Sequence, residues 1–418
     1  MMHHADYDIC IIGAGIAGLY CARELKRKQP KAKICLLEKY KEIGGRTYTF
    51  HTKVNGLDIS WEAGAGRIHK SHHQVLNLLN EYGIETIPIG DKIEWRTIKS
   101  PGHAEPIDFL RLFDNLGISQ LSEESLESMT IKQILQKTMG DNKTQDLMNR
   151  YEYRSELDTL KASNALYSLN HELGNHGGFC VVKGGFSVLI GKMKADISGV
   201  KLFLEHEVTD IQKLEIYEIS VKSRETIRAK KVIVAIPRDA LAALPCFRGL
   251  PILEQVKMRP LVRMYAVFPL GPDGKAWFAG LEKFVCDLPI RYVIPMDPTK
   301  GAIMISYTDG PEAEQWITKA KKSEIAVQRE VMAQIRSLFP EQKIPDPLFF
   351  KIHPWSDGCS YWAPVANKPY DFNLVSKASV KPLPDMPELY MCNESWAYAQ
   401  AWVKCSLDQA QKVIDLIE

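Results

Sequence analysis

The chain has 418 residues, of which 45% are hydrophobic and 25% are charged, and its formal net charge at pH 7 is +2. This length suits two domains, and the composition is typical of a globular protein. The near-neutral charge argues against a nucleic-acid partner or an anionic membrane surface. No apolar run reaches the roughly 20 residues that span a bilayer, and no signal peptide is visible, so we expect a cytoplasmic protein without membrane contact.

The nine cysteines are scattered along the chain and never form a CxxC pair. Several stand inside apolar runs, such as Ile9-Cys10-Ile11-Ile12. Scattered thiols in odd number are typical of a reducing compartment and not of a disulfide framework or a zinc site. We therefore expect free cysteines and no metal.

The first forty residues carry the sharpest pattern. The apolar run Tyr7–Ile12 predicts a strand, a glycine turn follows it, and a helix is expected from Leu19 to about Lys28. A second apolar run, Ile34–Leu37, ends directly before Glu38. This order of strand, glycine turn, helix, strand and acid predicts a dinucleotide-binding unit in an α/β fold.

Each glycine of the turn has a physical task. Gly13 permits the tight turn, Gly15 lets the backbone approach a pyrophosphate, and Gly18 lets the helix pack on the strand. The helix N-terminus offers unpaired N–H groups and the positive end of its dipole to the phosphates. Glu38, twenty positions after Gly18, would accept hydrogen bonds from a ribose diol. The alternative is a glycine turn that binds nothing.

The remaining elements follow in chain order. The stretch from Ser71 to Tyr167 predicts mostly helix, which we interpret as an inserted helical region. Strands are expected at residues 201–204, 208–211, 231–237, 262–268, 292–294 and 302–307. A helix is expected near residues 324–339, and a closing helix from Ala401 to the end of the chain.

A second glycine motif, Gly44-Gly45-Arg46-Thr47, follows the acid. The GxGxxG unit, the acid and GGR together resemble the flavin-containing amine oxidase superfamily, which includes monoamine, polyamine and L-amino-acid oxidases. The resemblance recurs in Gly184–Leu189, in Val232–Pro237 and in Glu394 eight residues before Trp402, and so runs along nearly the whole chain. It implies FAD as the cofactor.

The resemblance also implies the architecture, an α/β fold in which a Rossmann-like FAD-binding domain of the glutathione-reductase type is interleaved with an α+β substrate domain. The FAD-binding domain is expected to comprise residues 5–70, 178–246 and 380–418, and the substrate domain residues 71–177 and 247–379. Arg46 is expected to clamp the pyrophosphate, and a helix starting at Trp402-Val403 to face the flavin N1–C2=O edge. The cofactor-binding residues that the resemblance implies are Gly13, Gly15, Ile16, Ala17, Gly18, Glu38, Lys39, Arg46, Gly64, Ala65, Gly66, Arg67, Val208, Glu394, Trp402 and Val403.

The stretch Gly64-Ala65-Gly66-Arg67 resembles the G-x-M-R motif of L-amino-acid oxidases, whose arginine pairs with the substrate α-carboxylate; Gly66 stands in the place of methionine. The segment that contains Tyr292 resembles the one that supplies a tyrosine to the same carboxylate. Arg67, Tyr292 and Trp402 are therefore the expected substrate-binding residues. Alternatives are a pyrophosphate clamp or a structural ion pair with Glu62 for Arg67, and packing in a strand for Tyr292.

Two positions depart from the family pattern. Arg263 occupies the place of the lysine that is linked through water to flavin N5, and an arginine cannot accept a proton near neutrality. Arg263 and Trp402 are nevertheless the expected catalytic residues. Cys359 matches the cysteine that forms a thioether to the flavin in monoamine oxidases, but Ser360 replaces the aromatic residue that follows it there, so the sequence favours non-covalent FAD.

These observations predict an FAD-dependent oxidase of an amine, leaning to an L-amino acid, with oxygen as the acceptor. Hydride transfer from the Cα–H to flavin N5 would give an imine, then a keto acid, ammonia and hydrogen peroxide. Rival interpretations are a monoamine or polyamine oxidase, a flavin desaturase, or a non-catalytic FAD-binding scaffold or redox sensor. A homodimer is a further expectation, and His69, His72 and His73 are expected at the entrance or surface.

Overall fold

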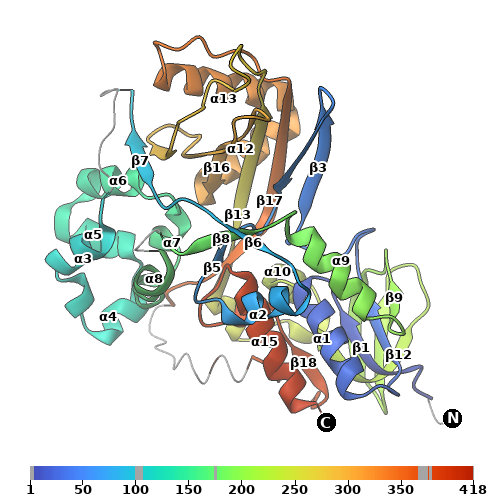
Figure 1. The fold of residues 1–418 in the computed structure, drawn as a ribbon. Coiled ribbons are helices and arrows are strands. Elements are labelled where there is room, and N and C mark those ends of the chain that lie inside the picture. Colours follow the sequence, from blue (N-terminus) through green and yellow to red (C-terminus); the bar gives the residue numbers. More distant parts are fainter. Residues whose placement is uncertain (1–3, 99–106, 174–176, 366–374, 376–378, 418) are drawn as a thin grey trace.

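The computed structural model describes residues 4–98, 107–173, 177–365, 375 and 379–417. Their strands form sheets of seven, six, three and two strands. The two large sheets stand at opposite ends of the molecule in Figure 1, and most of the helices of residues 107–173 form a separate layer beside them. All nine cysteines are free, as expected. No helix of the described residues is long and apolar enough to cross a membrane.

The seven-stranded sheet is built around β1, whose last four residues are buried. Its order is β10-β11-β12-β1-β2-β9, with β18 paired to β12. The strands next to β1 run parallel to it, as the βαβ pattern predicts. The bounds are β1 Tyr7–Ile12, β2 Ile34–Leu37, β9 Lys201–Phe203, β10 Val208–Lys213, β11 Tyr217–Val221, β12 Ile227–Val234 and β18 Leu389–Met391.

Four helices belong to this half of the molecule: α1 Ile16–Lys28, α2 His73–Glu81, α9 Phe186–Asp196 and α15 Val403–Leu416. The sequence placed the start of α1 at Leu19, which is three residues late. The helix begins at Ile16 because Gly15, in extended conformation with φ −68° and ψ 177°, serves as its N-cap. The apolar faces of α1, α9 and α15 share one buried cluster with β1 and β2.

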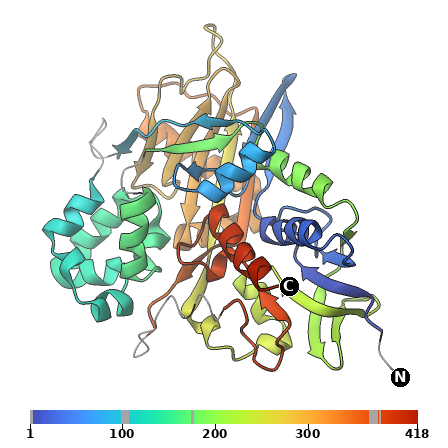
Figure 2. The same ribbon diagram turned by 60° about the horizontal axis from the view of Figure 1, so that its bottom comes forward.

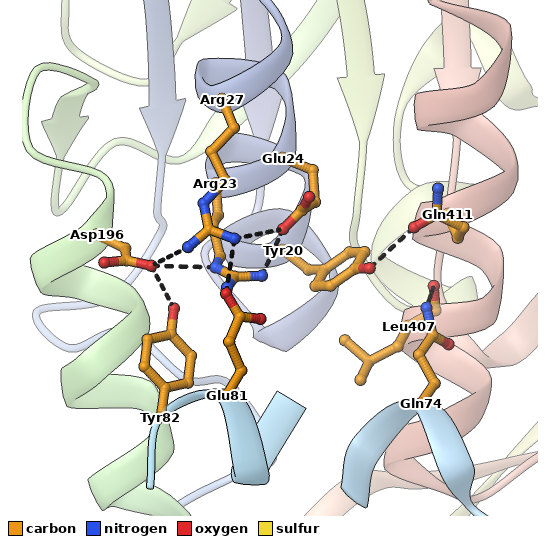
Figure 3. Close-up of polar contacts among 10 residues, drawn as sticks. All are labelled: Tyr20, Arg23, Glu24, Arg27, Gln74, Glu81, Tyr82, Asp196, Leu407 and Gln411. Carbon is orange, nitrogen blue, oxygen red and sulfur yellow. Dashed lines mark hydrogen bonds and ion pairs between the residues drawn. The ribbon is translucent and has the colours of Figure 1, made fainter. Parts of the chain in front are cut away.

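Arg23 on α1 joins three helices (Figure 3). Its buried guanidinium pairs with Glu24 of its own helix, with Glu81 at the end of α2 and with Asp196 at the end of α9. Arg27, one turn further along α1, pairs with the same acids of α2 and α9 at 2.8 and 3.0 Å. Because several carboxylates share two guanidinium groups, the cost of burying Arg23 is offset, and α2 and α9 are held against α1.

A second set of contacts in Figure 3 places α15. The Tyr20 hydroxyl of α1 donates to Gln411 Oε1 at 2.8 Å, and Gln74 Nε2 of α2 donates to the Leu407 carbonyl oxygen at 3.4 Å. Figure 2 shows α15 in red beside α2 in light blue. These contacts fix the direction of α15, whose N-cap is Trp402.

The six-stranded sheet has the order β17-β13-β16-β15-β14-β7. Helices α12 Gly310–Lys322 and α13 Glu324–Leu338 pack on one face, where Trp316, Val331 and Ile335 share a buried cluster with Val262 and Ile303. The strand bounds are β7 Ile93–Arg96, β13 Val256–Val267, β14 Lys283–Cys286, β15 Tyr292–Asp297, β16 Ala302–Asp309 and β17 Phe349–Trp362. Sequence patterns did not predict β17, although it is the longest strand.

The expected helical region is confirmed, and Figures 1 and 2 both show most of its helices after residue 107 standing apart on the left, whereas α2 lies beside α15. The region also contains two short strands, β6 Thr86–Pro88 and β7, which the sequence did not predict. The helices are α3 Phe109–Asn115, α4 Glu123–Ser128, α5 Ile131–Met139, α6 Asp141–Arg150, α7 Arg154–Asp158 and α8 Ala162–Ser168, with a π-helical turn η2 Leu169–Leu173.

A β-hairpin packs on the six-stranded sheet, where Trp61 shares a buried cluster with Tyr265 and Val267, and a separate small sheet is also present. The hairpin β3 Thr49–Val54 and β4 Leu57–Glu62 turns at Asn55 and Gly56, whose φ angles of 49° and 83° suit a two-residue hairpin turn. The small sheet has the order β5-β8-β6, with β5 Ile68–His69 and β8 Phe179–Val182. Short helices complete the fold: α10 Arg238–Ala242, α11 Ile252–Gln255, and the 3-10 turns η1 Ile118–Gln120, η3 Pro245–Phe247 and η4 Glu394–Trp396.

Every strand of the seven-stranded sheet falls within residues 5–70, 178–246 and 380–418. Every strand of the six-stranded sheet falls within residues 71–177 and 247–379. The division into FAD-binding and substrate domains along these bounds stays a prediction.

Candidate active site

A cavity of about 1190 Å³ extends between the two large sheets. At one end it is lined by the loops that follow β1, β2 and β12, and at the other by side chains of β13, β16, β17 and α7. The carboxyl ends of parallel strands are where α/β sheets bind ligands. The cavity therefore joins a nucleotide-type site to a second chamber formed by the other sheet.

Most of the residues expected from the sequence line this cavity. Gly18 and Tyr292 do not line it. Those that do are Gly13, Gly15, Ile16, Ala17, Glu38, Lys39, Arg46, Gly64, Ala65, Gly66, Arg67, Val208, Arg263, Cys359, Glu394, Trp402 and Val403.

The glycine turn leaves room for a ligand at the N-terminus of α1. A Cβ added to Gly15 would meet no protein atom within 4 Å, so it would project into the cavity that Gly15 lines. Helix α1 has no side-chain cap and no acid in its first turn. Gly18 plays a different part, since a Cβ there would overlap the Gly13 carbonyl oxygen. Free N–H groups and empty space at a helix N-terminus fit a pyrophosphate.

Glu38 is held rigidly beside this turn. Its Oε2 accepts a hydrogen bond from Ala14 N at 2.8 Å, and its Oε1 accepts one from Tyr40 N at 3.0 Å. Each carboxylate oxygen keeps a further lone pair for a ribose hydroxyl. Lys39 also lines the cavity and pairs with Glu207 at 2.9 Å. These residues fit the adenosine end of FAD.

Arg46, near the start of the chain, contacts Gly358 and Glu394 near its end. Its Nη1 pairs with Glu394 Oε1 at 2.7 Å and donates to the Gly358 carbonyl oxygen at 3.0 Å. The other carboxylate oxygen of Glu394 accepts from Ala401 N at 3.0 Å, and its Oε1 also accepts from Ser360 Oγ at 2.7 Å. The expected clamp on the pyrophosphate is thus fixed by a buried carboxylate while it lines the cavity.

Arg67 is surrounded by aromatic rings and forms no ion pair among the described residues, although the charge of the buried Glu152 acts on it. Its guanidinium carbon lies 4.7 Å from the ring centre of Phe179, 5.0 Å from that of Tyr153 and 5.8 Å from that of Trp402. No hydrogen bond or ion pair joins it to any residue within the described ranges. A cation over aromatic faces is stabilised without a carboxylate, which leaves the donor fork of Arg67 free for a ligand in the cavity.

The alternative ion pair between Arg67 and Glu62 is wrong. The carboxylate of Glu62 instead accepts hydrogen bonds from Phe186 N at 2.7 Å and Thr49 Oγ1 at 3.0 Å, at the start of α9. Burial raises the pKa of Glu62 to about 7 in spite of these hydrogen bonds. The acid nearest to Arg67 in sequence is therefore used to cap a helix.

Hydrogen bonds join the loop that carries Arg67 to the six-stranded sheet. Arg263 among the donors was predicted from the sequence, whereas Tyr265 and Trp355 were not. The Glu62 carbonyl oxygen accepts from the Tyr265 hydroxyl at 2.6 Å and from Arg263 Nη1 at 3.1 Å. The Ala63 carbonyl oxygen accepts from Trp355 Nε1 at 2.7 Å. No local pattern marks Tyr265 and Trp355, because their partners lie about 200 to 290 residues away in the chain.

Gly66 and Arg263, which both differ from the family pattern, lie next to each other. A Cβ on Gly66 would lie 3.2 Å from Arg263 Nη1. The guanidinium of Arg263 thus occupies the room that a larger side chain at position 66 would need. Arg263 also lies 5.3 Å from the ring centre of Tyr307, and it lines the cavity.

Tyr292 does not reach the cavity. Its ring packs against Tyr153 and Tyr307, with centres 6.1 and 6.3 Å away, and both of these tyrosines line the cavity. Its hydroxyl is buried without a hydrogen-bond partner of good geometry among the described residues. The expected contact of Tyr292 with a carboxylate in the cavity is not reproduced, and packing in strand β15 is the observed environment.

Cys359 lines the cavity beside the Arg46–Glu394 pair. Burial raises the pKa of its thiol to about 12, and the charge of Glu394 acts in the same direction. The thiol is therefore neutral near pH 7. Among the described residues, no group of three or more His, Cys, Asp and Glu side chains could hold a metal ion.

Of the three histidines expected at the entrance or surface, His73 is exposed, whereas His69 and His72 are buried and do not lie at the surface. His72 Nδ1 accepts from His69 N at 3.2 Å, which makes Nε2 the donor to Glu172 Oε1 at 3.1 Å. The ring of His72 lies 5.0 Å from that of Trp402. The histidine thus helps to hold the aromatic wall of the cavity.

Comparisons with known proteins agree with this geometry. Residues 16–413 match the family described as flavin containing amine oxidoreductase. An amine oxidase [flavin-containing] of Oncorhynchus mykiss is 24% identical over 267 residues, which are 55% of this chain and 50% of that protein. The (S)-6-hydroxynicotine oxidase of Paenarthrobacter nicotinovorans is 24% identical over 280 residues, 59% of this chain and 63% of that protein. The chain therefore spans only about half to two thirds of the length of these relatives.

A solved structure extends the likeness to the whole fold. Wild-type putrescine oxidase bound to putrescine has a TM-score of 0.75 and covers 98% of both chains at 15% sequence identity. A single-substitution mutant of putrescine oxidase, solved in a redesign of cofactor binding, has the same TM-score of 0.75 at 16% identity. At these identities the likeness concerns the fold.

Proposed function

The chain belongs to the flavin-containing amine oxidoreductase family, and from that premise we propose that it oxidises the Cα–N bond of an amine that carries a carboxylate, most simply an L-amino acid. The observation that carries this proposal is the free guanidinium of Arg67 inside the cavity. An arginine fork binds a carboxylate through two parallel hydrogen bonds.

FAD, the cofactor of this family, would supply the redox chemistry when bound, as the acceptor of a hydride from the substrate and the donor of electrons to oxygen. The protein supports this chemistry because it positions the substrate and excludes water from the site. Arg67 would hold the carboxylate, while Trp402, Tyr153 and Tyr307 provide an apolar wall around it. Arg263 stays charged and can orient or stabilise negative charge, but it cannot take up a proton.

The rival substrates differ in whether they carry a carboxylate that can pair with Arg67. A monoamine or a diamine without a carboxylate would leave its guanidinium unpaired in the cavity, which costs binding free energy. A non-catalytic scaffold would have no use for a second chamber lined by Tyr153, Tyr307 and Tyr361. The first observation favours the carboxylate-bearing amine over a monoamine or polyamine, and the second favours it over a scaffold; a flavin desaturase stays an alternative.

The decisive experiment uses wild-type protein loaded with FAD. L-amino acids and their decarboxylated amines are mixed with it anaerobically in matched pairs, and bleaching of the flavin absorbance is followed. We expect the amino acids to reduce the flavin at lower concentration than the amines. Equal reduction by both members of each pair would refute the carboxylate role and favour an amine oxidase. Cytoplasmic location and a homodimer are further proposals, to be tested by fractionation and by size-exclusion chromatography.

A further inference from the structure

Glu156 on α7 is a buried acid in the wall of the cavity. Only 7% of its surface is exposed, and its Oε2 has no hydrogen-bond partner among the described residues. It lines the same cavity as Arg67. A buried carboxyl group without a partner is costly and is normally compensated by a cation or by donors. None of the ion pairs of the described residues involves Glu156.

The surroundings of Glu156 are acidic, not basic. Burial, together with the charges of Glu172, Asp309 and Glu152, raises the pKa of Glu156 to about 8, and a hydrogen bond with Ser168 opposes this shift. The charges of Arg291 and Arg154 lower the pKa of Asp309, against the effect of its burial. Other titratable groups that face Glu156 are Tyr151 and Tyr361. No basic side chain of the described residues forms an ion pair with Glu156, so a cationic group of a ligand on the cavity side would stabilise its ionised form.

The position of Glu156 relative to Arg67 limits where such a charge can be. Tyr153 lies three residues before Glu156, and its ring packs 5.0 Å from the Arg67 guanidinium. Residues three apart at a helix start are close neighbours. The charges of both Arg67 and Glu156 act on the Tyr153 hydroxyl, and all three residues line the cavity, which therefore holds a cation and an acid near one tyrosine.

We propose that Glu156 recognises a second, distal basic group of the substrate, so that the preferred substrate carries a carboxylate at one end and an ammonium or guanidinium group at the other. This inference rests on the proposed function, because Arg67 must hold the carboxylate. Dibasic amino acids are the chemical class that fits. Near pH 7 the carboxyl group is mostly protonated, and it releases its proton to the buffer when the cationic group binds.

The test compares L-lysine with L-norleucine, which has the same chain length but no distal nitrogen. Anaerobic titration and rapid mixing of the FAD-loaded protein give a Kd and a limiting rate of bleaching for each. We expect wild type to bind L-lysine at least about tenfold more tightly. Glu156→Gln should abolish this preference by weakening L-lysine far more than L-norleucine. Asp158→Asn is the matched control, since it removes a carboxylate from the same helix at a residue that does not line the cavity.

The pH dependence of the preference for L-lysine is a second readout. It would not change if Glu156 had only a structural role. The α-amino and α-carboxyl groups of the two amino acids titrate alike, so the ratio of their Kd values reports on Glu156. In wild type the preference for L-lysine should grow as the pH rises from 6 toward 8, and in Glu156→Gln it should be flat.

Three results would overturn the proposal: no preference for L-lysine in wild type, a ratio of Kd values that does not change with pH, or equal weakening of both amino acids by Glu156→Gln. The last would place the α-amino group at Glu156. The wild-type comparison stands even if the variant does not fold. All these outcomes differ from failure of the carboxylate role, which would appear as equal reduction by amino acids and decarboxylated amines.

Discussion

Replacing Arg67 with alanine is the sharpest test of the carboxylate site. In the folded protein this guanidinium forms no ion pair with a side chain of the described ranges, although the charge of Glu152 acts on it, and three aromatic rings surround it at 4.7 to 5.8 Å. The substitution therefore breaks no ion pair among the described residues. Its effect on a carboxylate ligand should come from the lost charge pair and from the space left between the rings.

The expected loss follows from the burial of this pair. Truncating one partner of a buried, hydrogen-bonded charge pair costs about 2–5 kcal/mol, which corresponds to a Kd weakened roughly 30-fold to 5,000-fold. The decarboxylated amine should lose nothing, because it makes no contact with the guanidinium. Arg67→Lys should recover only part of the loss, since an ammonium keeps the charge but not the fork.

The assay is anaerobic titration of the bound flavin with an L-amino acid and with its decarboxylated amine, in wild type, Arg67→Ala and Arg67→Lys. The FAD content of each variant must be measured, because Gly64 to Arg67 line the cofactor cavity. Weakening of both ligands by the same factor would refute the reasoning. Arg67 would then act on the cofactor or on the shape of the cavity.

Four further predictions concern the cofactor and stability. Gly15→Val should fold, because a Cβ there meets no protein atom, but should lose FAD; a yellow variant would contradict this. Acid or heat should release FAD from wild type, and flavin retained on the Cys359 peptide after digestion would show a covalent bond. Arg23→Met should lower the free energy of unfolding by about 1–3 kcal/mol in urea titration without altering the flavin spectrum, since its carboxylate partners are partly exposed; an unchanged midpoint would be evidence against the network. Burial lowers the pKa of His353 to about 4, so between pH 4 and 6.5 the unfolded chain binds a proton that the folded chain does not, and stability should rise with pH there. His353→Gln should reduce that rise by up to about 3 kcal/mol, and an identical slope in both proteins would contradict this.

The nucleotide end of the site could be predicted because its signals are local. The glycines at 13, 15 and 18 and the acid at 38 belong to one strand–helix–strand unit, and short-range geometry alone brings them together. Even here the sequence misplaced the start of α1, since it could not show that Gly15 would be the extended N-cap.

Strand β17 illustrates why other parts were missed. Its sequence contains Pro354 and Gly358, which weaken the signal of a strand. The strand exists because it pairs along β13 with a shift in register between Arg259 and Leu261. For a related reason the sequence left open whether Tyr292 would line the cavity or pack in its strand, because alternation along a strand cannot show which neighbouring rings will cover a side chain.

The sequence by itself determined the cofactor class and the family, because a contiguous motif can encode a phosphate-binding turn through backbone geometry. Only the tertiary structure decided the environment of Arg67. Its three rings come from the segment before α7, from β8 and from the N-cap of α15, which are far apart in the chain. Burial likewise decides the properties of the Glu156 carboxyl group, since the same residue on an exposed helix would be an ordinary solvated charge. Side-chain chemistry is written in the sequence, but pairing and desolvation, which set the charge of the cavity, arise from contacts between distant segments.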